Sequence, residues 1–370
     1  MAKHTRIVAL LAAAIFVAVA CTGGGGTSPS TAASQSAGSP SVATSGGTSA
    51  SAGASASAFA LPKPEKSSVR IGLSVTETSQ YAAKLAQQLG IFEKNGLKAE
   101  ITVFEGDGKS MQALQAGQLD AGFVGVSSAI TSQTTDAPTV VLSTNATILS
   151  DLLTSIASVK TAADLKGKCV AVSTFGGTSH GAVLLSLQAL GLTPSDVVIT
   201  EVGGQSARIA ALQGGSCAAA PVDAAQKAEM EKLGFNFLVD LKKERTPWGR
   251  SGMAVRKDWL SENPNTATVL AASVLEAQNK MWTDPDTAAE KYAEFTQSDL
   301  TLAKSLIKDF QEIGDRTMMW TDEAFENPKK VLATANPDIA NVTVSQAFDR
   351  SILDNLKANG YYDQLGIPAQ

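Results

Sequence analysis

The sequence predicts an α/β protein with two lobes, each a mostly parallel sheet flanked by helices, and with a helical C-terminal layer. From residue 69 to residue 143, short β-branched runs alternate with segments of helical apolar spacing, which is typical of a doubly wound sheet. The same alternation restarts near residue 161, so a second lobe is expected. After residue 258, apolar residues recur at three- and four-residue spacing with charges between them, which indicates amphipathic helices.

The N-terminus has the three-part form of a secretory signal peptide over residues 1–20. Lys3 and Arg6 precede an apolar run, and small residues follow it. The run is short for a membrane-spanning helix. Ala18-Val19-Ala20-Cys21 resembles the bacterial lipobox, whose cysteine becomes the first mature residue and carries acyl chains, although Ala18 replaces the usual leucine. We therefore expect export and a lipid on Cys21. The alternative is an ordinary signal peptide with a spare thiol.

Residues 21–66 are expected to form a disordered, lipidated tether. Beyond Cys21 they are almost wholly Gly, Ser, Thr and Ala with scattered Pro. Such a composition cannot bury enough apolar surface to offset the entropy of ordering. No later segment is apolar for long enough to predict another membrane span.

The first lobe begins with a strand over residues 69–75, whose β-branched content is high. A helix over 81–92 follows and ends near Asn95-Gly96, a typical helix stop. The other elements expected in this lobe are a strand at 99–104, a helix at 109–116, a strand at 121–126, a short helix at 128–134 and a strand at 139–143.

The second lobe follows the segment at 161–167. Its expected strands lie at 168–173, 197–202 and 217–221, and its expected helices at 178–190 and 207–213. A strand at 252–256 precedes the C-terminal helices, which are expected at 266–282, 285–295, 299–313 and 344–359. None of these helices is apolar enough to form a core alone, so we expect them to pack on an existing lobe.

Two cysteines, Cys169 and Cys217, stand at the start of apolar β-like runs in the second lobe. In an oxidising compartment two thiols raise the question of a disulfide, and neighbouring parallel strands would allow the bridge. The alternative is two small buried hydrophobic side chains. The sequence leaves both open.

Catalytic and metal sites find little support in the sequence. Gly177-Thr178-Ser179-His180-Gly181 fits the nucleophile elbow of hydrolases. However, His180 is the only histidine after the leader, and beside Ser179 at a helix start it is poorly placed to act as its base. Gly108-Lys109-Ser110 resembles the end of a phosphate-binding loop, but Val103 stands where the leading glycine belongs. One histidine and two cysteines in separate segments give no metal-ligand spacing, so neither a metal nor a cofactor is expected.

Small polar residues recur just after the expected strands and at helix starts in both lobes. Unpaired N–H groups at helix N-termini favour an anionic or hydrogen-bonding solute, and ligands of open parallel sheets bind at the carboxyl ends of the strands. Helix capping is the alternative for any single residue, but the recurrence in both lobes favours a ligand site. These residues are Thr76, Thr78, Ser79, Gly106, Asp107, Ser127, Ser128, Ser173, Thr174, Gly176, Gly177, Thr178 and Ser179.

Several segments around these residues resemble a known family. They lie at 87–101 (QQLGIFEKNGLKAEI), 112–125 (QALQAGQLDAGFVG), 157–199 and 252–282. Together they resemble the substrate-binding proteins of ABC importers, in particular the sulfonate, nitrate and taurine group, which shares a fold with the thiamin-precursor binders. The most specific segments are ADLKG before the second lobe and VRKDWL followed by NP after it.

The resemblance implies a type II periplasmic-binding-protein-like fold, in which two lobes close on a solute like a hinged clamp. Lobe one would comprise residues 67–155 and 252–370, and lobe two residues 156–251, with hinge crossings at 151–159 and 251–256. The implied ligand contacts are Thr76, Thr78, Ser79, Gly125, Ser127, Ser128, Thr174, Gly177, Thr178 and Asp223, with Trp248 near the cleft and Asn145 as a further candidate.

Some residues depart from what an anion receptor would need. Glu77 and Asp223 would repel a small anion if both faced the cleft ionised, whereas an amine or amidine would be attracted. No arginine is obvious among the cleft loops, since Arg208 opens a helix and Arg250 lies beyond Trp248. A small anion, a planar heteroaromatic solute and an amine-bearing solute all remain open.

The expected function is that of a non-catalytic, monomeric solute receptor in the periplasm or at the outer face of the cytoplasmic membrane. Its partners would be a small solute, an ABC permease and, through the lipid, the membrane. A net charge of −5 does not favour nucleic acid as a partner. The rival is an enzyme like the pyrimidine synthases of thiamin biosynthesis, which share this fold and consume an active-site histidine. A ligand-sensing subunit without transport is a third possibility.

Overall fold

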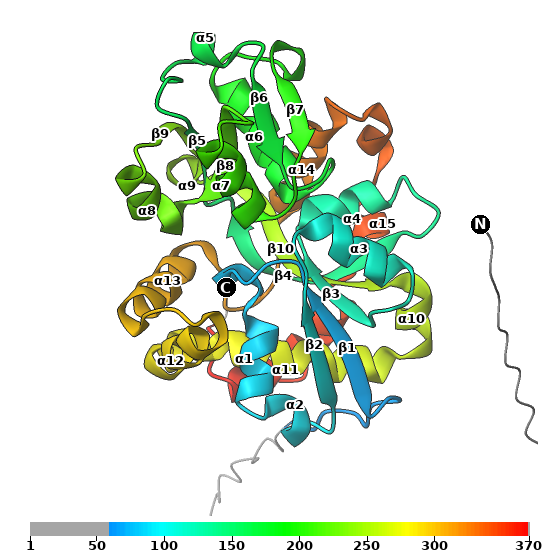
Figure 1. Ribbon diagram of the computed structural model, residues 1–370. Coiled ribbons are helices and arrows are strands. Elements are labelled where there is room, and N and C mark those ends of the chain that lie inside the picture. Colours follow the sequence, from blue (N-terminus) through cyan, green and yellow to red (C-terminus); the bar gives the residue numbers. More distant parts are fainter. Residues whose placement is uncertain (1–58, 369–370) are drawn as a thin grey trace, which may run out of the picture. The chain divides into compact units, whose positions relative to one another are not determined.

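Two five-stranded sheets organise residues 59–368, the part of the chain that the computed structural model describes (Figure 1). The predicted signal peptide, the lipidation of Cys21 and most of the predicted tether lie outside these residues. No helix among the described residues is long and apolar enough to cross a membrane.

The first sheet has the strand order β2 (Lys98–Val103), β1 (Ser68–Leu73), β3 (Ala121–Val124), β10 (Pro247–Arg256) and β4 (Thr139–Ile148). β1 is parallel to β2 and β3, whereas β10 runs antiparallel between β3 and β4. Val69, Ile71 and Leu73 of β1 are fully buried. Helices cover such a sheet, and burial of these side chains is what holds its centre.

The second sheet has the order β7 (Val198–Glu201), β6 (Cys169–Val172), β8 (Ala219–Asp223), β5 (Asp151–Ser155) and β9 (Asn236–Asp240). β6 is parallel to β7 and β8, and β5 runs antiparallel to both β8 and β9. Each sheet therefore has one strand that opposes the direction of the others. The predicted α/β class with two mostly parallel sheets is confirmed.

The two connections between the sheets lie earlier in the chain than expected. β4 ends at Ile148 and β5 begins at Asp151, and all of β5 pairs within the second sheet. The return runs through α9 (Leu241–Glu244) into β10, whose whole length belongs to the first sheet. β5 and β9 were not predicted. Every residue of β5 is buried, so it shows no alternation by which a strand could be recognised.

The helices of the two lobes largely follow the expected order along the chain. They are α1 (Ala82–Gln88), α2 (Ile91–Lys94), α3 (Asp107–Gln115) and α4 (Val126–Ser132), then α5 (Ala162–Leu165), α6 (Thr178–Ala189), α7 (Gln205–Gln213) and α8 (Lys227–Lys232). The single helix expected at 81–92 is broken at Gly90, whose φ of 67° lies in the left-handed region.

The C-terminal layer is helical, as predicted. It comprises α10 (Lys257–Glu262), α11 (Pro264–Thr283), α12 (Pro285–Thr296), α13 (Leu300–Ile313), α14 (Asp322–Ala333), α15 (Val344–Ala347), α16 (Ser351–Ala358) and α17 (Tyr361–Gln364). α11 packs on α1 and α2 of the first lobe, while α14 contacts α6 of the second lobe (Figure 1). The helix expected at 344–359 is split, because Phe348 pairs with Val141 of β4.

The end of the predicted tether is packed against the protein. The Glu65 carboxylate accepts hydrogen bonds from the N–H groups of Asn265 and Thr266 in the first turn of α11. An anion is stabilised at this end of a helix. Phe59 lies edge-on to Tyr361, with ring centroids 5.8 Å apart. Disorder up to residue 66 was therefore a wrong prediction for residues 59–66, because they find specific partners far along the chain.

Candidate ligand-binding site

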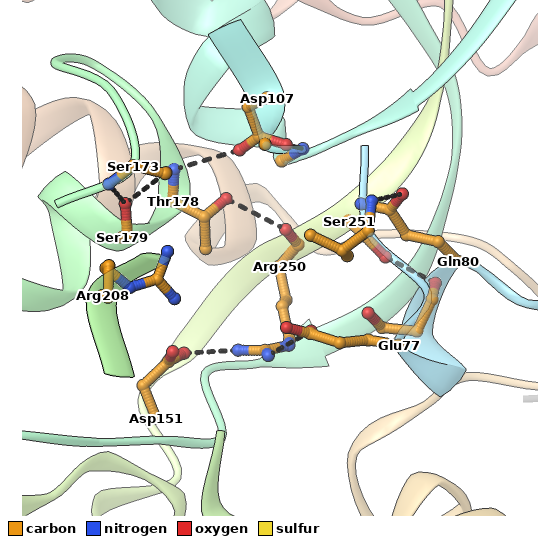
Figure 2. Close-up of a pocket in the computed structure, with 14 residues that line it drawn as sticks. Glu77, Gln80, Asp107, Asp151, Ser173, Thr178, Ser179, Arg208, Arg250 and Ser251 are labelled. Atoms are coloured by element: carbon orange, nitrogen blue, oxygen red, sulfur yellow. Dashed lines mark hydrogen bonds and ion pairs between the residues drawn. The ribbon is translucent and has the colours of Figure 1, made fainter. Parts of the chain in front are cut away.

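Loops from the carboxyl ends of strands in both sheets enclose a cavity of about 50 Å³, which we call the inner cavity (Figure 2). This edge is where open α/β sheets bind ligands. The inner cavity is lined by Val75, Glu77, Ser79, Gln80, Gly106, Asp107, Gly125, Asp151, Ser173, Thr178, Ser179, Arg208, Arg250 and Ser251. A second, outer cavity of about 490 Å³ shares Val75, Glu77 and Gly106 with it.

The loop after β1 is held by Gln80. Its Oε1 accepts hydrogen bonds from the N–H groups of Ser74 (2.8 Å) and Val75 (3.3 Å), and its Nε2 donates to Ser74 Oγ. The short 3-10 turn Thr78–Gln80 brings this amide back beneath the strand end. Consequently Glu77 and Ser79 are presented to the inner cavity from a fixed loop.

Asp107, the first residue of α3, joins the two lobes. Its Oδ1 accepts hydrogen bonds from Ser74 Oγ at 2.6 Å and from the Gly125 N–H at 3.0 Å. Its Oδ2 accepts a weaker one from the N–H of Thr178, at 3.4 Å, at the start of α6. One buried carboxylate thus connects the ends of β1 and β3 with the helix that opens the facing wall.

Arg250 is the electrostatic centre of the site. It lies on β10 of the first sheet and is only 4% exposed. One terminal nitrogen is paired with Asp151, and the other lies 2.7 Å from Glu77 and 2.6 Å from Asp223. Asp151 and Asp223 are on β5 and β8 of the second sheet, so these ion pairs link the lobes directly.

Three carboxyls around one guanidinium leave an excess of negative charge. Burial raises the pKa of Glu77 to about 7, against the attraction of Arg250 and helped by the repulsion of Asp223 and Asp151. Burial disfavours the charge of Arg250, but the three carboxylates together hold its pKa well above the ordinary value. The guanidinium therefore stays charged while Glu77 titrates near neutral pH.

The lobes approach closely where glycines face the opposite wall. A Cβ atom at Gly125 would lie 1.7 Å from Thr178 Oγ1, and one at Gly181 would lie 2.5 Å from the Trp248 ring. Thr131 Oγ1 also donates a hydrogen bond to the Gly176 carbonyl across the lobes. The arrangement is a closed one, and the absence of side chains at these glycines permits it.

The predicted ligand contacts are distributed over several environments. Ser79, Gly125 and Thr178 line the inner cavity, and Thr76 lines the outer one. Thr78 and Asp223 line a small cavity of about 20 Å³ on the other side of Arg250. Gly177 is the N-cap of α6, and the Thr174 hydroxyl donates to Glu201.

Ser127, Ser128 and Trp248 are buried against α6 rather than exposed to a cavity. Their hydroxyl and indole N–H groups have no hydrogen-bond partner among residues 59–368. Asn145 lies apart on β4, where its amide donates to Gln278 of α11 at 2.6 Å. Asn145 is thus placed among packing contacts and lines neither the inner nor the outer cavity.

The expectation that no arginine reaches the cleft was wrong. Arg208 and Arg250 both line the inner cavity, and Asp151 was expected only as part of a hinge. β10 begins at Pro247, so Arg250 is a strand residue and not part of a loop beyond Trp248. A signal did exist, because Arg250 is the only charged residue between Pro247 and Val255, and a buried charge needs a partner.

Residues 62–296 match the model of the NMT1-like family. The chain belongs to the NMT1-like family. A protein of Brucella abortus (strain 2308) that is named as a binding protein is 28% identical over 249 residues, which cover 62% of this chain and 72% of the relative.

Three solved structures share the fold of this NMT1-like protein. The alkanesulfonate-binding protein SsuA from Xanthomonas axonopodis pv. citri has a TM-score of 0.65 at 17% identity, covering 78% of this chain and 99% of that one. The periplasmic nitrate-binding protein NrtA from Synechocystis PCC 6803 has a TM-score of 0.62 at 16% identity, covering 84% and 93%. The desulfurization enzyme DSZB has a TM-score of 0.58 at 16% identity, covering 79% and 99%. The predicted family resemblance and the predicted fold are confirmed.

Proposed function

We propose that this protein is an extracytoplasmic receptor that clamps a small solute between its two lobes and delivers it to an ABC importer permease. The observation that carries the proposal is the inner cavity, whose wall is built by side chains of both lobes. A solute bound there contacts both lobes only when they are closed, so its binding energy favours closure. A permease that recognises the closed form would then distinguish the loaded receptor from the empty one.

The family and its relatives support a binding role. Two solved structures with this fold are named for an alkanesulfonate and for nitrate, and the Brucella relative is named as a binding protein. The sequence features at the N-terminus fit this role, since a lipid on Cys21 and a flexible tether would keep the receptor near a permease in the same membrane. Transport and ligand sensing without transport would use the same clamp.

The enzyme alternative would depend on His180, and the structure gives this side chain a local role. Its Nδ1 accepts a hydrogen bond from the Gly176 N–H, and its ring packs edge-on against Phe175. His180 does not line the inner cavity. Burial lowers the pKa of His180, opposed by Glu201, which favours the neutral imidazole that such an acceptor needs. His180→Asn should therefore leave solute binding intact.

The test is a thermal-shift screen of the mature protein against sulfonates, nitrate, pyrimidines, amines and amino acids. A ligand that binds the native state at about 100 times its Kd adds roughly 2.7 kcal/mol of stability. We expect one chemical class to raise the melting temperature by several degrees, and we expect permease genes beside the gene for this chain. Stabilisation by no class, together with no importer gene nearby, would contradict the receptor function.

A further inference from the structure

Arg208 on α7 is a buried cation with unused hydrogen-bonding capacity. It is 5% exposed, and its Nε donates to the Pro221 carbonyl at 3.0 Å. Its two terminal nitrogens have no acceptor and no ion-pair partner among residues 59–368. Figure 2 shows the guanidinium directed between Thr178 and Asp151, into the inner cavity. Burial lowers the pKa of Arg208, and the attraction of Asp151 and Glu77 offsets this only in part. Burial of a charged group without a direct partner is costly, and an anionic group of a ligand would supply that partner.

The N-terminus of α6 forms the wall beside Arg208. Thr178 and Ser179 open this twelve-residue helix, and both line the inner cavity. The first N–H groups of a helix lack intrahelical acceptors and carry a partial positive charge. The Thr178 N–H already donates weakly to Asp107, so the groups available to a ligand are the next N–H groups of the helix. Together with the free nitrogens of Arg208, they make this side of the cavity suited to carboxylate or sulfonate oxygens.

The part of the cavity around Arg250 is acidic, with Glu77 from the first lobe and Asp151 from the same lobe as Arg208. Glu77 and Asp151 each use one carboxylate oxygen on Arg250, and their other oxygens accept no hydrogen bond from any residue of the described chain. With Asp107 beside α6 and Asp223 on the other side of Arg250, four carboxylates outnumber the two arginines, so the ionised cluster has a net negative charge. A lone anion would be repelled by this cluster, whereas a lone cation would leave Arg208 unpaired.

We propose that the solute is a small zwitterion, with its anionic oxygens on Arg208 and the α6 N-terminus and with an ammonium group on Glu77 and Asp151. This inference rests on the receptor function proposed above and names the class of its solute. A volume of about 50 Å³ holds roughly four water-sized groups, so the two charges are separated by only a few atoms. Any longer part of the solute would extend past Val75 and Gly106 into the outer cavity.

The experiment is calorimetric titration of the mature protein with a matched set of small compounds. Glycine, β-alanine and γ-aminobutyrate carry both charges at increasing separation, whereas acetate and methanesulfonate carry only the negative charge and ethylamine only the positive one. We expect one of the three zwitterions to bind at least about 100-fold more tightly than any singly charged compound, since each of them lacks one charged pair.

Variants test the assignment of each charge. Arg208→Gln and Glu77→Gln should each weaken binding of the preferred zwitterion by about 30-fold or more. Arg350→Gln, at an exposed arginine that pairs with Asp354 and lines neither the inner nor the outer cavity, should change it less than about 2-fold. Circular dichroism checks folding, and if Arg208→Gln does not fold, the comparison of compounds on the native protein decides.

Two outcomes would overturn the zwitterion assignment. One is a singly charged compound that binds as tightly as every zwitterion, and the other is a folded Arg208→Gln variant with unchanged affinity. Both would leave the receptor function standing. Failure of every compound in the wider thermal-shift screen would instead contradict the receptor function itself.

Discussion

At the scale of residues, the ion cluster around Arg250 dominates the behaviour of the site. The guanidinium is buried, and its three carboxylate partners come from both lobes. Burial makes each charge expensive unless it is paired, so removing one member has consequences for all the others.

Glu77 should make the stability of the protein depend on pH in an unusual direction. Its pKa rises from 4.5 to about 7 in the folded protein, so the folded state binds the proton more tightly than the unfolded state. The stabilisation is fully present below about pH 4.5 and is lost as the pH rises through 7. Glu77→Gln replaces the titrating carboxyl with an amide, so the variant does not lose this stability as the pH rises. The free energy of unfolding of the Gln variant relative to wild type should therefore increase by roughly 2–3 kcal/mol between pH 4.5 and pH 8 in urea denaturation. A difference that does not vary with pH would contradict this assignment.

Arg250→Met should destabilise the protein by about 3–5 kcal/mol, because it leaves three neighbouring carboxylates without a counter-charge. Lys242→Met is a matched control. Lys242 also joins the lobes, from α9 to Asp309 and Glu312 of α13, but these partners are 40% and 50% exposed. An exposed ion pair contributes only about 0–1 kcal/mol. Urea denaturation at pH 7.5 measures the free energy of unfolding of both variants. If both lose the same small amount of stability, the ion pairs of Arg250 do not stabilise the fold as predicted.

At the scale of elements, a disulfide joins Cys169 at the start of β6 to Cys217 just before β8. The sequence left this pairing open because thiol spacing does not reveal strand neighbours. The two strands are adjacent in the second sheet, and this is what brings the sulfurs together. The bridge closes a loop of 48 residues that contains α6 and β7.

Removing the bridge with Cys169→Ala and Cys217→Ala should lower the free energy of unfolding by about 2–4 kcal/mol, because the unfolded chain regains the entropy of that loop. Denaturant titration of the oxidised wild type and the double variant measures the difference. In mass spectrometry of the unreduced protein, neither cysteine should react with an alkylating reagent. Labelling of both thiols would show that the bridge does not form.

At the scale of the whole molecule, closure brings buried polar groups of the first lobe against α6. The hydroxyls of Ser127 and Ser128 and the indole N–H of Trp248 have no partner among the described residues. A buried polar group without a partner costs about 1–3 kcal/mol, and opening would expose these groups to water. The cluster at Arg250 opposes opening. In the proposed receptor, these two effects oppose each other, so the binding energy of a solute would shift the equilibrium between an open and a closed form.

An engineered cross-link can detect this closure. A Cβ atom at Gly108 of α3 would lie 3.2 Å from the Cβ of Thr174, which follows β6 in the other lobe. Disulfides need about 3.5–4.5 Å between these atoms, so a small shift suffices. Gly108→Cys combined with Thr174→Cys should cross-link under mild oxidation, and faster when a binding solute is present. Intact mass measures the bond, and each single variant is the control. No cross-link at any solute concentration would contradict the closed arrangement.

Local patterns in the sequence were sufficient for the fold class and for most elements. Alternating strand and helix signals identified both sheets, and polar residues after the strands identified Ser79 and Thr178 at the inner cavity. Helix and strand periodicity reports which side of an element is buried, so it is readable from neighbouring residues. Prediction from periodicity fails where every residue of an element is buried, as in β5. It also fails where a contact with a distant strand interrupts a helix, as at Phe348.

Only the folded structure shows which charged side chains form ion pairs with one another. Asp223, Asp151 and Glu77 lie 27, 99 and 173 residues from Arg250 along the chain, and no local pattern relates them. The two crossings between the sheets bring these residues to one point, and the same crossings leave the end of Arg208 unpaired beside α6. Local residue patterns were enough to predict two lobes with polar loops at their strand ends. Whether a charge there is paired or available to a solute depends on distances across the lobes, which only the folded chain defines.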